Sequence, residues 1–428
     1  MKKTSFVIKT FGCKVNQYES QSIRESLLAA GYTELSMQDA SVIIVNSCTV
    51  TGQADIKTRR CIRRAKKENP GASIIVTGCY AVEDDDIALL NEMPEISVVV
   101  TNDKKSRIPS IVRELNDDGP ADLATEERVS GLCRHSRAFV KIQDGCDQNC
   151  SYCKVSLVRG PSVSRPAGKI LEEISRVYAN GYREIVLTGI CLGAWRDGSR
   201  DLPFLLKDIQ RVQGDFRIRL SSIEPNFITG ELVNTIKSLE NVCRHFHIPL
   251  QSGSDRVLSK MKRRYNINMF DNIIDKIREK LPLSGITMDV ITGFPGETEE
   301  DHFLTLEYIK KVRPSRLHVF GYSDRKGTVS FEMKDKVPQE VIKKRVEELM
   351  KTGQMLGNEF ARCFIGREIE VLAERDMKKD VMHGYSGEYV PVKFEDPYRS
   401  AGDIVKAVPY DIDESSGYLV AKVHQKNP

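Results

Sequence analysis

Short apolar runs alternate with longer amphipathic stretches along the first part of the chain. The runs are rich in Val and Ile, as strands are, and cover residues 5–10, 41–46, 73–77 and 97–100. The intervening stretches have helical composition and cover residues 16–30, 54–69, 83–92 and 104–116. Nearly continuous apolar strands separated by helices are typical of a parallel sheet covered on both faces. We therefore expect a doubly wound α/β domain over residues 1–116.

The alternation resumes on a longer scale in the middle of the chain. The expected strands are residues 139–143, 184–188, 217–221, 245–249, 287–291 and 316–320, and a long helix over residues 338–359 follows them. Six successive strand-helix units favour a full or partial (β/α) barrel over residues 132–363, with an open sheet as the alternative. The acidic, turn-rich residues 117–131 have the composition of a linker between the two α/β domains.

The pattern of apolar and polar residues changes again near the carboxyl terminus. Short strand-like runs occur at residues 368–372, 387–392, 403–408 and 418–423, separated by Gly, Asp and Pro. This pattern predicts a small all-β domain over residues 364–428, either an antiparallel barrel or a sandwich.

Composition adds a limit and a clue. The chain has 428 residues with 64 basic and 60 acidic side chains, a net charge of +4, so any basic surface must be local. Its 11 cysteines follow no apolar signal segment, and no apolar run reaches the length of a membrane span. We expect a cytoplasmic protein without membrane segments, in which cysteines more often bind metal, act in redox chemistry or pack than form disulfides.

Three cysteines lie within eight residues directly after the first strand of the central domain: Cys146, Cys150 and Cys153. Structural zinc sites need four protein ligands, and no fourth follows at a suitable spacing. Three thiolates suit an iron-sulfur cube with one iron left open. Packing, or a zinc site that borrows His135, is the alternative.

Three further cysteines each follow a strand of the first domain: Cys13, Cys48 and Cys79. The carboxyl ends of parallel strands share one edge of a sheet, so these thiols should meet there. Chance burial of small cysteines is the alternative. The remaining cysteines, for which we expect packing roles, are Cys61, Cys133, Cys191, Cys243 and Cys363.

The two cysteine triads make the chain resemble the radical S-adenosylmethionine methylthiotransferase family over its whole length. Further similarity lies in residues 219–225, 248–254 and 288–297, and residues 364–428 resemble the family's RNA-binding TRAM domain. Residues 11–18, 54–59 and 158–166 are most similar to the branch that acts on threonylcarbamoyladenosine in tRNA. Isopentenyladenosine in tRNA and a ribosomal-protein aspartate are the alternative substrates within the family. A non-catalytic iron-sulfur protein that binds RNA or senses redox state is the alternative outside it.

The resemblance implies two [4Fe–4S] clusters, one on each triad, and S-adenosylmethionine as both methyl donor and radical source. It implies that a methylthio group is added to C2 of an adenine beside the anticodon, with the tRNA anticodon stem-loop as partner. An electron donor such as flavodoxin or ferredoxin is implied as well. The residues implied to bind S-adenosylmethionine are Tyr152, Thr188, Gly189, Ser222, Glu224 and Gln251.

A dense basic run follows Cys48 and supplies most of the candidate RNA contacts. Within residues 57–69 the basic side chains are opposed by the single acidic Glu68. The candidate phosphate contacts are Lys57, Arg59, Arg60, Arg63 and Arg64, with Arg159 and Arg165 after the second triad. A solvated helix face is the alternative. The terminal domain has more acidic than basic residues, so RNA binding there would rest on local groups such as Tyr385 and Tyr389.

Overall fold

The computed structural model describes residues 4–116, 127, 129–131, 135–376, 381–395 and 400–423. The chain divides into two compact units. The first comprises residues 1–133, 144–162 and 323–328, and the second comprises residues 134–143, 163–322 and 329–428. Most of the expected linker, residues 117–131, lies outside the described residues, and the three predicted domain boundaries stay predictions.

The first unit is built on a five-stranded parallel sheet with the strand order β2-β1-β3-β4-β5. Its strands are β1 (Ser5–Thr10), β2 (Thr33–Glu34), β3 (Val42–Ser47), β4 (Ser73–Gly78) and β5 (Val98–Val99). Its helices are α1 (Lys14–Ala29), α2 (Gly52–Glu68), α3 (Asp84–Asn91), α4 (Ile108–Glu114) and α5 (Val155–Arg159). The sequence missed β2, which is only two residues long.

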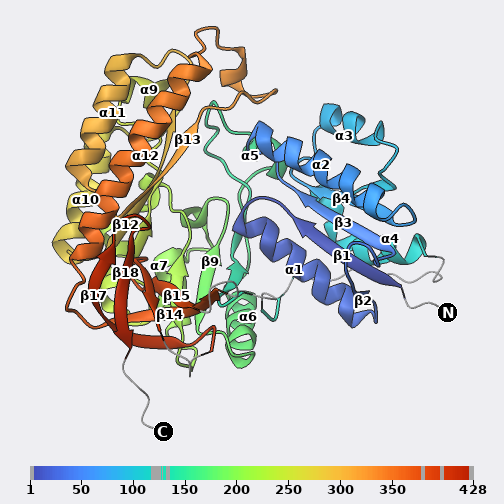
Figure 1. The fold of residues 1–428 in the computed structure, drawn as a ribbon, viewed down its shortest axis with the longest axis horizontal. Helices are drawn as coiled ribbons and strands as arrows, with labels where there is room; N and C mark the ends of the chain where they lie inside the picture. The colour runs from blue at the N-terminus through green and yellow to red at the C-terminus, as the bar shows by residue number, and fades with distance from the viewer. Residues whose placement is uncertain are drawn as a thin grey trace. The chain divides into compact units, whose positions relative to one another are not determined.

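Helices cover both faces of this sheet (Figure 1). Successive strand residues alternate between the faces, so Phe6 joins one buried cluster and Val7 the other. Helices α1 and α4 close the first cluster through residues such as Leu27, and α2 and α3 close the second through residues such as Ile62. The predicted doubly wound architecture is therefore confirmed.

The second unit contains six parallel strands in the order of a partial barrel. They form two three-stranded sheets, β10-β9-β6 and β11-β12-β13, and β10 and β11 are joined by isolated bridges. The strands are β6 (Ala138–Lys141), β9 (Glu184–Thr188), β10 (Arg217–Leu220), β11 (His245–His247), β12 (Gly285–Thr292) and β13 (Arg316–Gly321). Two very short strands, β7 (Gln143–Asp144) and β8 (Val163–Ser164), lie in the segments where the chain passes between the units. The fold class predicted for this part of the chain is therefore confirmed.

Amphipathic helices pack on the partial barrel, and two of them begin at recognisable signals. They are α6 (Ala167–Ala179), α7 (Leu202–Ile209), α8 (Gly230–Ser238), α9 (Asp255–Lys260), α10 (Ile267–Lys280), α11 (Glu299–Val312) and α12 (Gln339–Arg362). Thr298 and Asp301 form a capping box at the start of α11. Pro338 precedes α12, the predicted closing helix, and α12 packs beside β13.

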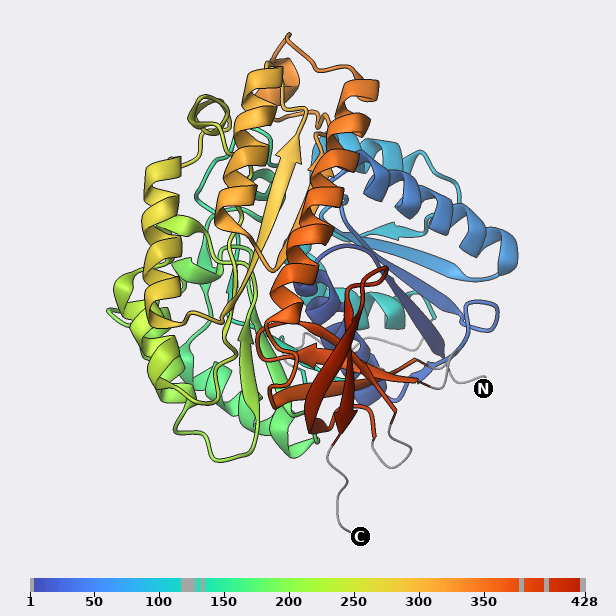
Figure 2. The ribbon, with the colours of Figure 1, turned by 60° about the vertical axis from the view of Figure 1, so that its left-hand side comes forward.

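The carboxyl-terminal strands form a closed five-stranded barrel below the end of α12 (Figure 2). Its strands are β14 (Ile369–Asp376), β15 (Val381–Ser386), β16 (Pro391–Phe394), β17 (Ile404–Asp413) and β18 (Tyr418–Val423). An all-β barrel was predicted, although β15 was missed. The expectation of purely antiparallel pairing is wrong, because β16 and β18 run parallel.

Buried arginines attach this barrel to the rest of the second unit. Arg217 and Arg219 of β10 form ion pairs with the fully buried Glu184 of β9, at 2.6 and 2.9 Å. Burial raises the pKa of Glu184, but the charges of both arginines outweigh it and hold the pKa well below its usual range. The same arginines donate hydrogen bonds to the carbonyls of Tyr385 and Ser386, at 2.9 and 2.8 Å. The charged strand residues therefore serve to hold the terminal barrel.

The two tyrosines considered for RNA contacts take part in this packing. The ring of Tyr389 stacks on Tyr385 at 4.6 Å and on His245 of β11 at 4.7 Å. The guanidinium of Arg219 lies 4.9 Å from the Tyr389 ring centre. These rings are partly exposed, and their stacking joins the terminal barrel to β10 and β11.

Two simpler findings concern the remaining cysteines and the membrane. Cys191 and Cys243 are buried, as packing residues should be, whereas Cys363 is exposed, so a packing role for Cys363 is wrong. Cys133 lies outside the described residues. Within the described chain, no helix combines the length and apolarity needed to cross a membrane.

Candidate active site

Three cysteines from distant parts of the sequence stand at one edge of the first sheet. Cys13 precedes α1 and comes shortly after β1, Cys48 follows β3, and Cys79 follows β4. These strands are consecutive neighbours and parallel, so their carboxyl ends share that edge. Gly12 permits the close approach: its φ is +106°, and a Cβ there would lie 2.7 Å from the Cβ of Cys48.

Two thiols of this first triad, those of Cys48 and Cys13, disfavour the ionised state when no cation is bound. Burial raises the pKa of the Cys48 thiol to about 11, and charge on Cys79 or Cys13 acts in the same direction. Cys13 is exposed as a whole residue, yet desolvation of its thiol by the surrounding protein also raises its pKa. Three thiolates can therefore coexist here only beside added positive charge, which bound iron supplies. The donor set fits a [4Fe–4S] cluster with three protein ligands.

A buried arginine, Arg159 at the end of α5, supplies fixed positive charge to this edge. Its side chain is 3% exposed, and its Nε lies 3.3 Å from the sulfur of Cys79. The guanidinium also donates hydrogen bonds to Glu19 at 2.7 Å and to Asp144 at 3.0 Å. Burial opposes the charge, but these acidic groups and the Cys79 thiol raise the pKa of Arg159 well above its usual value. Such an enclosed guanidinium is poorly placed for the phosphate contact predicted for it.

The sequence missed two polar residues of α1 that complete this arrangement. Asn16 accepts a hydrogen bond from Arg159 and donates to the backbone carbonyls of Phe11 and Ser47, both at 2.8 Å. Glu19 is 5% exposed and pairs with Lys105 as well as Arg159. Asn16 and Glu19 are three residues apart and therefore lie on one helix face. Polar residues at that spacing directly after a cysteine are the signal that would have indicated a site.

A second buried arginine lies beside the residue that follows Cys48. Arg325, in the short segment 323–328 of the first unit, donates hydrogen bonds to Thr49 and Asp55 at 2.5 and 2.6 Å. Burial raises the pKa of Asp55, and the bond from Arg325 opposes that rise. Arg325 is far from Cys48 in sequence, so no local pattern pointed to it.

The second triad occupies the loop before α5, within the same compact unit. Cys146, Cys150 and Cys153 are all partly exposed. Gly145 is required before them, because a Cβ there would lie 1.9 Å from the carbonyl oxygen of Pro161. Backbone hydrogen bonds within the loop join Cys153 to Cys150 at 3.1 Å and Cys146 to Gly160 at 3.1 Å. Three thiols on a loop that folds back on itself fit the three-cysteine binding of an iron-sulfur cube.

Lys154, directly after the second triad, fixes the loop to the first sheet domain. Its side chain is 3% exposed and forms ion pairs with Glu83 and with Asp86, the latter at 3.2 Å. The ion pairs of Lys154 at one end and the bond from Arg159 to Asp144 at the other attach the loop of the second triad at both of its ends.

Most residues implied to bind S-adenosylmethionine lie at the carboxyl ends of the partial-barrel strands. Thr188 ends β9 with Gly189 next to it, Ser222 bridges to His247, and Glu224 forms an ion pair with Arg263. Gln251 has a φ of 64°, and its buried Oε1 has no hydrogen-bond partner. Ligand sites of such barrels form at this end. Tyr152 is partly exposed and belongs to the loop of the second triad.

Two known families match the chain, one on each side of the linker. Residues 5–101 match a family described as "Uncharacterized protein family UPF0004". Residues 140–309 match the radical SAM superfamily, which implies S-adenosylmethionine and a [4Fe–4S] cluster as cofactors.

Curated relatives extend over most of the chain. "Threonylcarbamoyladenosine tRNA methylthiotransferase MtaB" of Thermotoga maritima is 40% identical and covers 90% of this chain and 90% of its own. The Bacillus subtilis protein of the same name is 36% identical over 93% of this chain and 92% of its own. The chain belongs to the radical S-adenosylmethionine methylthiotransferase family. A Clostridium tetani "tRNA-2-methylthio-N(6)-dimethylallyladenosine synthase" is 32% identical, over 88% of this chain and 87% of its own.

Solved structures place this methylthiotransferase in a wider fold group. The radical S-adenosylmethionine methyltransferase TsrM from Kitasatospora setae has a TM-score of 0.59 at 12% identity, over 77% of both chains. The cobalamin-dependent radical enzyme OxsB has a TM-score of 0.51 at 8% identity, over 82% of this chain and 56% of its own. At such low identity these similarities concern the fold alone.

In this methylthiotransferase, the exposed face of α2, the helix that follows Cys48, carries basic side chains. Its buried positions, among them Thr58, Ile62 and Ala65, follow helical spacing and leave the opposite face to solvent. The exposed basic residues are Lys57, Arg60, Arg63, Arg64 and Lys67. The helix therefore presents a continuous cationic face.

Two other candidate RNA contacts have partners within the protein. Arg59 of α2 donates a hydrogen bond of 2.5 Å to the hydroxyl of Tyr80, the residue after Cys79. Arg165 donates to the carbonyl of Lys141 at 2.6 Å and to Glu173 at 2.8 Å. Both arginines are less available to phosphate than the exposed ones of α2.

Proposed function

We propose that this enzyme adds a methylthio group to C2 of N6-threonylcarbamoyladenosine next to the anticodon of tRNA. The observation that carries the proposal is the pair of cysteine triads in one compact unit, which suits a reaction needing both a radical and a sulfur site. The substrate follows from the higher identity to threonylcarbamoyladenosine enzymes than to the dimethylallyladenosine enzyme, 40% and 36% against 32%.

Each triad would hold its own [4Fe–4S] cluster. The first triad, Cys13, Cys48 and Cys79, would bind one cluster. The second triad, Cys146, Cys150 and Cys153, would bind the other. When bound, the cluster on the second triad would supply the electron that cleaves S-adenosylmethionine. The cluster on the first triad would supply the place where sulfur is held and methylated. The residues of the chain provide the surroundings for this chemistry.

Arg159 is the central positioning residue in this proposal. Its contacts with Cys79 and with Asp144, two residues before Cys146, tie the edge of the sheet to the second loop. Its permanent positive charge offsets thiolate charge in a place from which water is largely excluded. Glu19 and Asn16 fix the direction of the guanidinium.

RNA would bind along the exposed face of α2. Lysines and arginines on one helix face give a phosphate backbone a row of contacts without reading its sequence. Helix α2 starts shortly after Cys48, so an anticodon loop bound along its basic face would extend toward the first triad. The site residues Thr188, Gly189, Ser222, Glu224, Gln251 and Tyr152 remain the candidates for binding S-adenosylmethionine. A flavodoxin- or ferredoxin-type electron donor and a cytoplasmic location belong to the same proposal.

Mass spectrometry of tRNA nucleosides tests the substrate. Cells with and without the gene are compared, and the deletion strain is complemented with the wild type or with Cys48→Ala. We expect the 2-methylthio form of threonylcarbamoyladenosine to disappear in the deletion and to return only with the wild-type gene.

Persistence of that nucleoside in the deletion, in a strain without a second related gene, would contradict the proposal. Loss of the 2-methylthio form of isopentenyladenosine instead would assign the enzyme to the other tRNA branch.

A further inference from the structure

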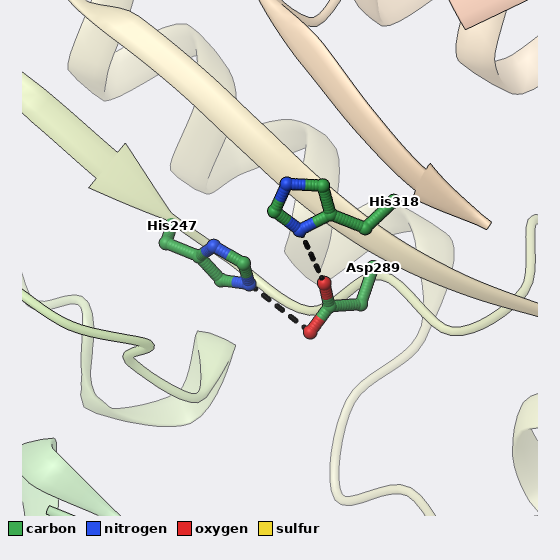
Figure 3. Close-up of side chains that lie close together, drawn as sticks. All are labelled: His247, Asp289 and His318. Carbon is green, nitrogen blue, oxygen red and sulfur yellow. Dashed lines mark hydrogen bonds and ion pairs between the residues drawn. The ribbon is translucent and has the colours of Figure 1, made fainter. Parts of the chain in front are cut away.

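Three side chains on neighbouring strands of the partial barrel converge at a place to which no role has been assigned. Figure 3 shows His247, Asp289 and His318 pointing toward one another from β11, β12 and β13. One ligand atom from each of the three lies within 4.8 Å of the others. The Nε2 of His247 is 3.0 Å from one oxygen of Asp289, and the Nδ1 of His318 is 3.1 Å from the other.

Strand register places these residues on one face of the sheet. Asp289 of β12 is paired directly with His318 of β13, while His247 of β11 pairs with Thr287, two residues before Asp289. Side chains two apart on a strand share a face. The neighbours Met288 and Val290 turn to the opposite face, where they join the main hydrophobic core. The arrangement is thus fixed by backbone pairing and does not depend on mobile loops.

Hydrogen bonding between the three side chains explains only part of the arrangement. The contact between His318 and Asp289 is a hydrogen bond. The Nε2 of His247 is buried and close to Asp289, but it has no well-directed hydrogen-bond partner. A buried ring nitrogen without such a partner leaves a lone pair or proton that a further ligand can satisfy. A cation at the centre of the three groups would satisfy it.

The local charge also favours a cation. Glu224 and Arg263 lie nearby and form an ion pair, so their charges offset each other. Asp289 brings the carboxylates in this region to two, against one guanidinium. The side chains of His247, Asp289 and His318 are 16%, 24% and 33% exposed, so one side of the cluster stays open to water or another ligand.

We propose that His247, Asp289 and His318 bind one divalent transition-metal ion, separate from the iron of the two cysteine triads. Two imidazole nitrogens with one carboxylate oxygen are a common donor set for Zn²⁺ and Fe²⁺, whereas Mg²⁺ and Ca²⁺ prefer oxygen ligands. Three protein ligands leave open positions on the metal, as in catalytic sites.

The test uses the full-length protein with its iron-sulfur clusters reconstituted without oxygen. After treatment with a chelator, the protein is equilibrated with Zn²⁺, desalted and analysed for zinc and iron per chain. We expect one equivalent of zinc in the wild type and its loss in His318→Gln and Asp289→Asn, with iron unchanged. His383→Gln is the matched control, because His383 is partly exposed and faces Glu374 outside this cluster; it should retain the zinc.

Zinc X-ray absorption distinguishes this site from the cysteines. Binding to the cluster gives nitrogen and oxygen neighbours at about 2.0–2.1 Å, whereas zinc on thiolates gives sulfur at about 2.3 Å. Sulfur neighbours, zinc that is retained in both single variants, or a wild-type zinc content no higher than that of those variants would each overturn the proposal. Unchanged circular dichroism and iron content show that a variant is folded. The zinc content is read without tRNA, so failure here leaves the proposed methylthio transfer unaffected.

Discussion

The two cysteine triads are built in opposite ways. The second triad is local: Cys146, Cys150 and Cys153 share one loop and are partly exposed. The first triad is assembled by the fold, because Cys13, Cys48 and Cys79 come from three strand ends. A local loop keeps a site open to an exchangeable ligand, whereas a sheet edge fixes a site through the whole domain. This difference fits the proposed division of work, in which the second triad binds S-adenosylmethionine and the first triad holds sulfur.

The largest effect is expected when the second triad is disrupted, because this separates its role from that of the first triad. Cys150→Ala should abolish release of 5′-deoxyadenosine from S-adenosylmethionine, because no three-thiolate site remains in the loop. Iron should fall from about eight to about four per chain if each cluster is of the [4Fe–4S] type. Cys61→Ala, a cysteine of α2 outside both triads, is the control and should keep full iron and activity. Continued release of 5′-deoxyadenosine by Cys150→Ala would contradict the proposal that the second triad cleaves S-adenosylmethionine.

The reciprocal substitution tests the first triad, at the edge of the sheet. Cys48→Ala should also lose about half of the iron, since one of two equal clusters is removed. It should still cleave S-adenosylmethionine but form no methylthio product, as measured by chromatography of both reaction products. If cleavage fails together with sulfur transfer while the loop cluster is intact, the two triads do not divide the work.

Arg159 offers a way to weaken the link between the triads without touching a cysteine. Arg159→Gln leaves Glu19 and Asp144 without their cation, and the loss of one partner of a buried pair costs about 3–5 kcal/mol. The reduction potential of the edge cluster should also fall, because nearby positive charge favours the reduced form. Potentiometric titration followed by electron paramagnetic resonance measures it. Arg159→Lys should restore most of the potential but less of the stability, since lysine cannot make the same forked contacts.

The basic face of α2 should give smaller, additive effects on RNA affinity. Arg60→Gln and Arg63→Gln should each weaken tRNA binding and reduce the slope of log affinity against log salt by about 1 per lost phosphate contact. Arg211→Gln, at an exposed arginine of the second unit, is the control. Equal slopes for all variants would place the RNA elsewhere.

The smallest effect concerns the protein without clusters. The pKa of Cys48 is raised from 9.0 to about 11 in the folded state, so the folded protein holds this proton more tightly than the unfolded chain. Its contribution to stability is complete below pH 9 and is lost as the pH rises toward about 11. Denaturant titrations should show this loss for the cluster-free wild type and a smaller one for Cys48→Ala. An identical pH profile for both proteins would show that folding does not raise the pKa of Cys48.

Much of the fold could be read from the sequence, because the strands are apolar and the helices amphipathic. The elements that the sequence did not predict are short or lack a clear pattern of apolar positions. Examples are β2 (Thr33–Glu34) and β15 (Val381–Ser386). The parallel pairing of β16 with β18 is a tertiary property that no local pattern encodes.

The cysteines were visible in the sequence because their chemistry is rare and their positions follow strands. Their supporting residues were not visible. Arg159 belongs to a basic loop that suggested RNA, and only its burial among Glu19, Asp144 and Cys79 indicates another role. His247, Asp289 and His318 are separated by helices in sequence and are brought together by strand register alone.

One measurement tests the central claim, that two separate sites cooperate on one adenine, most directly. The reconstituted enzyme is incubated with tRNA whose threonylcarbamoyladenosine carries deuterium at C2, and both products are analysed by mass spectrometry. The account predicts that the nucleoside gains a methylthio group at C2 while the deuterium appears in 5′-deoxyadenosine. Cleavage of S-adenosylmethionine without deuterium transfer or methylthio product would contradict it, provided that the same enzyme holds about eight irons per chain.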